Sequence, residues 1–89
     1  MKIVCTPLYE EQLKALLSSF AEEDFKATKA FKLYLDTIII NIGTKAHKYK
    51  QSIHFDDENI KDIEHEEYTI IFFEDISNKN YVLLSIIKR

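Results

Sequence analysis

Chain-breaking and cross-linking residues are scarce in this 89-residue sequence, which contains one Gly, one Pro and one Cys. So few breakers leave little room for a linker, and we expect a single domain over residues 1–89. The lone Cys5 cannot form an internal disulfide. No apolar run has the length of a membrane span, so we expect no membrane partner. The N-terminus lacks the long apolar core of a signal peptide, which predicts a cytoplasmic protein.

A basic excess is also missing, because 15 acidic residues against 12 Lys and Arg give a net charge of −3. This balance lacks the positive surface of a typical nucleic-acid-binding protein and argues against direct binding of nucleic acid. The charges are unevenly placed. Residues 44–54 contain three Lys, two His and no acid, whereas residues 56–67 contain seven acids and one Lys.

Apolar residues at helical spacing predict two helices in the first half of the chain. Thr6 is a suitable N-cap and Pro7 a suitable first residue, so the first helix should run from about residue 7 to 21. A second apolar stripe over residues 31–42, followed by Gly43 as a C-terminal stop, predicts another helix. The short break between the two predicts an antiparallel hairpin.

A two-residue period of apolar side chains predicts strands elsewhere. The expected strands lie near residues 2–6, 48–55, 60–65, 68–75 and 81–87. This order predicts an α+β fold, with an N-terminal strand and an antiparallel helix hairpin packed on an antiparallel sheet of about four strands. We expect its core to include Leu17, Phe31, Leu35 and Ile38.

No motif for catalysis, metal binding or a cofactor is evident. The three His residues lack the paired spacing of zinc ligands, and Cys5 lies in a short apolar strand with no nearby base in the sequence. Asp56, Asp57 and Glu58 are explained by a turn. We therefore predict no catalytic residues, no metal and no cofactor, and the question of enzymatic activity stays open at this stage.

Basic residues in the second half are the best candidates for contact with another protein. In a strand over residues 48–55, alternate side chains would form one basic face, which strands on either side could extend. An ordinary solvated face explains the same pattern, and composition alone slightly favours it. The candidate contact residues are Lys48, Lys50, His54, Lys61, Lys88 and Arg89.

Surplus apolar residues predict a second contact surface. Leu33, Ile39 and Ile40 lie outside the stripe that one core face can hold. On so small a chain, such a surplus indicates a groove for a partner or a face for homodimer formation.

The segment Lys48–Asp62 followed by Tyr68–Phe73 resembles a family pattern of the form K-Y-R-K-S-I-x-F-D-D-E-N-I-R-D and then G-Y-T-I-x-Y. The pattern is similar to that of ParE-like plasmid-stabilisation proteins in the RelE/ParE toxin superfamily, and the expected order of elements agrees with that fold. The resemblance implies the toxin component of a type II toxin–antitoxin system, neutralised by a cognate antitoxin. ParE-type members act by binding DNA gyrase.

RelE-type members instead cleave mRNA on the ribosome, which gives an alternative function of endoribonuclease. They are strongly basic, whereas this chain is acidic, and Lys50 and Lys61 stand where the pattern has Arg, the better bidentate partner for phosphate. These departures favour a toxin that binds its target without catalysis. A divergent, non-toxic relative is the remaining alternative.

Overall fold

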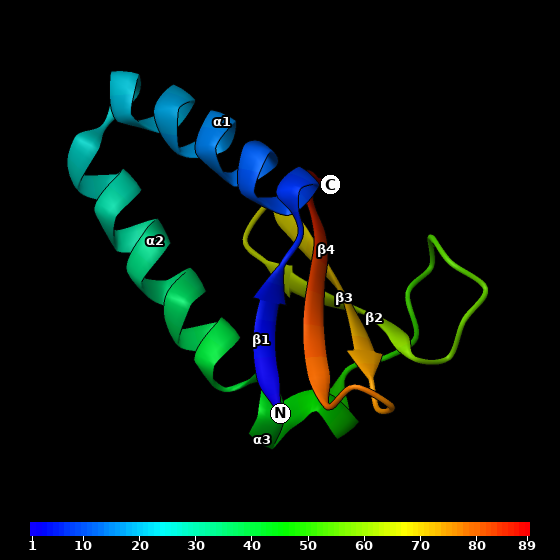
Figure 1. Cartoon of the computed structure of the whole chain (residues 1–89). Coiled ribbons are helices and arrows are strands. Elements are labelled where there is room, and N and C mark those ends of the chain that lie inside the picture. Colours follow the sequence, from blue (N-terminus) through cyan, green and yellow to red (C-terminus); the bar gives the residue numbers. More distant parts are fainter.

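A computed structural model describes all 89 residues as one α+β unit in which a helix hairpin lies on one side of a four-stranded sheet (Figure 1). A short 3₁₀ helix covers Ala46–Lys48. In chain order the helices and strands are β1 (Lys2–Cys5), α1 (Pro7–Glu23), α2 (Phe25–Ile40), α3 (Ile42–Lys45), β2 (Ile60–His65), β3 (Tyr68–Asp75) and β4 (Asn80–Lys88).

The sheet has the strand order β1-β4-β3-β2 and is mixed. The pairs β2–β3 and β3–β4 are antiparallel, but β1 runs parallel to β4, so the expectation of a wholly antiparallel sheet is wrong. The cause lies in the connections. The hairpin returns the chain to the end of the sheet where β1 began, so β2 and then β4 run in the same direction as β1 (Figure 1).

Both main helices begin at caps that the sequence encodes. Thr6 Oγ1 accepts a hydrogen bond from Tyr9 N at 3.1 Å, and Pro7 occupies the first turn of α1 as expected. Asp24 alone separates the helices and caps α2 by accepting from Ala27 N at 3.0 Å. No helix is both long and apolar enough to cross a membrane.

The second helix does not end as the sequence suggested. It stops at Ile40, where Asn41 is the C-cap and its Nδ2 donates to Thr37 O at 2.8 Å. Gly43 lies inside the short α3 and has no positive φ, so it is not a left-handed stop residue. Because the Asn41 side chain already satisfies a terminal carbonyl of α2, the helix needs no glycine there.

The expected strand over residues 48–55 does not form. Only Gln51 makes a bridge, to Lys61 of β2, and Ser52 N donates to Ile60 O at 2.7 Å. Beyond this point the Asp62 carboxylate accepts a hydrogen bond from Ile53 N, and the chain turns away from the edge of β2. Residues 53–59 then form a loop on the side of the sheet opposite the helices (Figure 1).

The core lies between the hairpin and the sheet. Phe31 and Leu35 of α2 are buried as expected, whereas Leu17 and Ile38 are half-buried and pack on its margin. From the sheet, alternate residues of β2, β3 and β4 face the helices. The largest fully buried side chains are Tyr9, Leu35, Ile42, Ile70, Phe72 and Leu83.

The end of β4 is covered by a helix where β1 stops. Because β1 pairs only as far as Leu83, the backbone of Ile86 has no strand partner on that side. The side chain of Gln12 in α1 supplies the acceptor that a neighbouring strand would provide. Its Oε1 accepts from Ile86 N at 2.9 Å and from Ser85 Oγ at 2.8 Å. Gln12 therefore couples α1 to the sheet at a position that a strand edge would otherwise leave open.

Candidate binding surfaces

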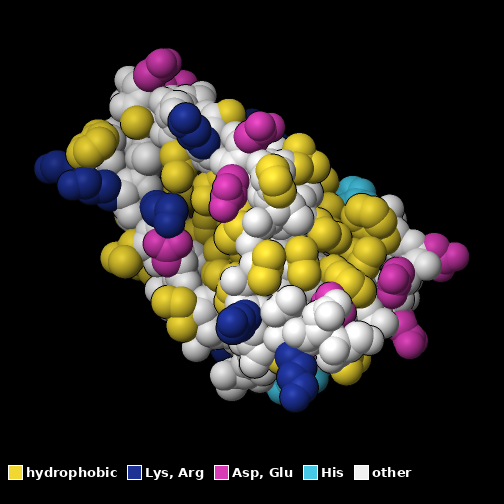
Figure 2. Space-filling model, viewed as in Figure 1, with side chains coloured by type: hydrophobic (Ala, Val, Ile, Leu, Met, Phe, Trp, Pro, Cys, Tyr) yellow, Lys and Arg dark blue, Asp and Glu magenta, His cyan; other side chains and the backbone are white.

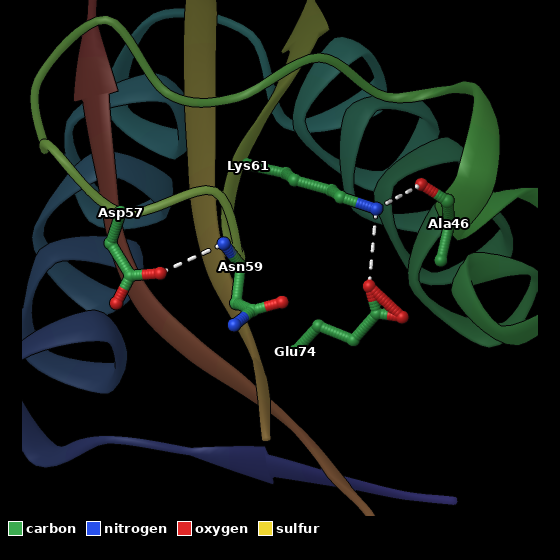
Figure 3. Close-up of polar contacts among 5 residues, drawn as sticks. All are labelled: Ala46, Asp57, Asn59, Lys61 and Glu74. Atoms are coloured by element: carbon green, nitrogen blue, oxygen red, sulfur yellow. Dashed lines mark hydrogen bonds and ion pairs between the residues drawn. The ribbon is translucent and has the colours of Figure 1, made fainter. Parts of the chain in front are cut away.

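Lys61, one of the basic contact candidates, is engaged inside the protein (Figure 3). Its Nζ lies 2.9 Å from Ala46 O and 3.1 Å from Glu74 Oε1. The two side chains are only 15% and 21% exposed. Lys61 therefore joins the segment after α3 to β2 and β3, and it is not free to bind a partner.

The acidic turn next to Lys61 is a structural turn, as the sequence suggested. Asn59 N donates to Asp57 Oδ1 at 2.8 Å (Figure 3), and Ile60 N donates to Asp57 O at 3.0 Å. Asn59 O in turn accepts from Glu74 N at 2.8 Å. These bonds fix the start of β2 against the end of β3.

The two basic residues at the end of the chain also face carboxylates. Lys88 Nζ lies 3.9 Å from Glu67 Oε2, a long contact between exposed groups. Arg89 Nη1 lies 3.2 Å from Glu64 Oε2, and its Nη2 donates to the backbone oxygen of Glu66. Their charges are thus largely balanced by neighbours on β2 and the β2–β3 turn.

Lys48 and Lys50 are exposed and form no ion pair. Lys48 ends the 3₁₀ helix, Lys50 lies beside β2, and His54 lies in the following turn. The six basic candidates therefore do not converge on one face. What remains is a small pair of free lysines beside the β2 edge.

The apolar candidates on α2 divide into two kinds. Leu33 and Ile40 are 69% and 76% exposed, whereas Ile39 is half-buried against the core. Phe25, which sequence reasoning missed, is also exposed on this helix, and so is Tyr34, which the sequence placed in the apolar stripe over residues 31–42. The outer side of α2 thus carries a discontinuous apolar stripe with no partner in the chain.

The β1 edge of the sheet is uncovered. All four of its residues are exposed, including the apolar Ile3 and Val4. Along a parallel strand, alternate residues direct their backbone groups away from the neighbouring strand. The register with β4 places those free groups at Ile3 and Cys5, which leaves a short edge open to strand addition.

The side chains that could bind a metal or act as a nucleophile were located in the same structure. No three side chains among His, Cys, Asp and Glu lie close enough together to hold a metal ion. Partial desolvation, and then the nearby Glu10 carboxylate, raise the pKa of the Cys5 thiol against the opposing effect of Lys32. A raised thiol pKa lowers the thiolate fraction at neutral pH, which is unfavourable for a nucleophile.

A further surface, which sequence reasoning did not find, lies on the sheet face turned away from the helices. A hollow of about 510 Å³ there is lined by apolar side chains from α1, the 53–59 loop, β3 and β4. The signal in the sequence was the last strand, which is apolar on both faces. The apolar residues of this lining are Leu8, Phe55, Ile71, Leu84 and Ile87.

Comparison with models of known protein families and with curated proteins finds no match to this chain.

Proposed function

We propose that this protein is the toxin component of a type II toxin–antitoxin system of the RelE/ParE kind. In this proposal it is ParE-like, binds a cellular target of the gyrase type, and is neutralised by a cognate antitoxin. The resemblance of Lys48–Asp62 supports it, as does the order of one strand, a helix hairpin and three strands. The observation that carries it is the amount of unpartnered apolar surface on so small a chain.

Two of these surfaces suit an antitoxin segment. The stripe with Leu33 and Ile40 on α2 fits the apolar side of an amphipathic helix, and the open β1 edge accepts an added strand. A short, partly disordered partner can use both surfaces at once, because a flexible segment wraps a large area. Lys48 and Lys50, which are free of ion pairs, add attraction for acidic residues of that partner.

The target is tested with purified protein in two assays. It should inhibit the supercoiling of relaxed plasmid by DNA gyrase, and induced expression in bacteria should slow growth. Primer extension on translated mRNA should give no cuts at codons in the ribosomal A site, since the dispersed basic groups supply no acid–base set. Reproducible cuts there would replace this proposal with an mRNA interferase. Inactivity in every assay would indicate a non-toxic relative.

The antitoxin contact is tested by reversing the two free lysines. Lys48→Glu together with Lys50→Glu should weaken binding of the protein encoded beside this gene by about tenfold or more, because attraction becomes repulsion across the interface. Calorimetry measures the affinity and circular dichroism checks the fold. Lys14→Glu is the control, since Lys14 is exposed and unpaired on α1, which carries neither of the two proposed contact surfaces. Equal affinity for the wild type and the Lys48/Lys50 variant would show that these lysines are only solvated.

A further inference from the structure

The face of the sheet opposite the helices is apolar and only partly covered. The strand register places Phe73 beside Val82 and Ile71 beside Ser85, on the side away from the core residue Phe72. Ile71 is buried on this side, whereas Phe55 of the 53–59 loop, which lines the same hollow, is 44% exposed. Figure 2 shows apolar side chains gathered from the centre of the view towards this loop on the right.

A groove runs across this face. The apolar hollow that contains Phe55 and Leu84 shares His54 and Ile87 with a second hollow of about 430 Å³. Most of the residues that line the second hollow are polar or charged, and it reaches Asp62 at the edge of the sheet. The two hollows therefore adjoin on this face, the one near α1 lined mainly by apolar residues and the one near β2 mainly by polar or charged residues, and we call the two together the groove.

The loop beside this groove carries unpaired negative charge, and we call its acidic residues the rim. Asp56, Asp57 and Glu58 follow Phe55 directly, are exposed and form no ion pair. Figure 2 shows acidic side chains on the outer side of the loop. At the polar end, Asp62 Oδ1 is buried and has no hydrogen-bond donor.

Positive groups near the groove offset this charge only in part. Lys88 and Arg89 line the polar hollow, but each faces a carboxylate of its own. Lys50 lies opposite Asp62 in register without forming an ion pair, and His54 stands in the wall between the hollows. The groove thus offers an apolar floor beside exposed carboxylates that have no ion-pair partner.

We propose that this groove binds a short segment of another protein that carries apolar side chains for the floor and Lys or Arg for the rim. A second copy of this chain is a poor occupant, because a twofold arrangement would place one acidic rim against another. A basic, apolar segment satisfies both the floor and the rim. The proposal does not depend on the toxin–antitoxin assignment, and its chemistry is opposite to that of the partner expected at Lys48 and Lys50.

The test begins with a library of random 12-residue peptides displayed on phage and selected against the full chain. Enriched peptides should combine large apolar residues with Lys or Arg. The best peptide, made synthetically, is then titrated into ¹⁵N-labelled protein. The amide signals that move should be those of residues 53–59 and the middle of β3 and β4. Failure to enrich any sequence, enrichment of acidic peptides, or shifts confined to α2 would overturn the proposal.

Variants separate the floor from the rim. Phe55→Ser and the double change Asp56→Lys with Glu58→Lys should each weaken peptide binding at least tenfold. The loss of affinity in Phe55→Ser should depend little on salt. The double variant should reverse the salt dependence of binding, because the rim then repels the basic peptide. Leu33→Ser is the control, because Leu33 is also exposed but lies on the outer side of α2. The loop changes leave the core untouched, so thermal unfolding should stay close to wild type. Unchanged affinity in both loop variants would refute the groove as the site. A dimer in sedimentation that Phe55→Ser dissolves would assign the face to a second copy and overturn the proposal.

Discussion

Replacing Lys61 with Met removes a cation that connects three parts of the chain. The Nζ atom joins the carbonyl of Ala46, after α3, to the carboxylate of Glu74 on β3, while the lysine itself lies on β2. Met keeps most of the aliphatic stem and loses only the charge and its donors. The expected effect is therefore electrostatic, with little change in packing.

The magnitude follows from the two contacts and their exposure. A hydrogen bond to a charged group contributes roughly 1.5–3 kcal/mol, and breaking a fully buried ion pair costs about 3–5 kcal/mol. Because Lys61 and Glu74 are 15% and 21% exposed, water partly replaces the lost partner. We expect Lys61→Met to lower the free energy of unfolding by about 2–3 kcal/mol. In a domain of this size that loss lowers Tm by roughly 10–20 °C.

Urea denaturation followed by circular dichroism measures this loss, and a double-mutant cycle assigns it. Glu74→Gln alone should cost less than Lys61→Met, because the amide oxygen still accepts a hydrogen bond. The coupling energy between the two sites should be about 1–2 kcal/mol. Lys14→Met, at an exposed position on α1, is the control and should change stability by less than about 0.5 kcal/mol. If Lys61→Met were as stable as that control, with no coupling to Glu74, the argument that Lys61 is a structural cation would fail.

Three further predictions concern the core and its polar contacts. Leu35→Ala, at a fully buried position, should cost about 2–5 kcal/mol in urea unfolding, whereas Leu33→Ala on the exposed side of the same helix should cost under about 0.5 kcal/mol. Tyr9→Phe removes a buried hydroxyl without a partner, so stability at pH 7 should stay equal or rise. Burial raises the pKa of the Tyr9 phenol, so the unfolded chain ionises first as pH rises above about 10, and the variant should lose less stability there than the wild type. Gln12→Leu leaves Ile86 N without an acceptor and should cost about 1–3 kcal/mol, with faster hydrogen exchange at that amide than in the wild type. Stability equal to wild type in Leu35→Ala or Gln12→Leu, or a loss at pH 7 in Tyr9→Phe, would contradict the corresponding assignment.

Local signals predicted the helices well because their causes lie within a few residues. Thr6 and Pro7 fix the start of α1, and Asp24 fixes the start of α2, through contacts three residues away. The same holds for the turn at Asp57. The direction of β1 could not be read in this way. Its parallel pairing with β4 depends on where the hairpin returns the chain, which no short pattern encodes.

The strand expected over residues 48–55 shows the other limit of pattern reasoning. Its alternation has a real basis, since Tyr49 packs against Phe72 in the core and Lys50 is exposed. Alternation alone does not supply a neighbour to pair with, however, and the Asp62 carboxylate draws Ile53 off the sheet edge. The basic face expected from that strand was lost with it, because its residues lie in a helix end, an edge and a turn.

The groove on the outer sheet face follows from how few layers this chain can build. Two helices cover one face of the sheet, and β3 and β4 nevertheless carry apolar residues on both faces. On the second face Ile71 is buried, but Phe55 and Ile53 of the 53–59 loop stay exposed, so this face is covered incompletely. A sheet that served only its own core would alternate apolar and polar side chains. The second apolar face is therefore best explained by a partner that completes the layer, and the acidic residues beside Phe55 indicate that this partner is basic.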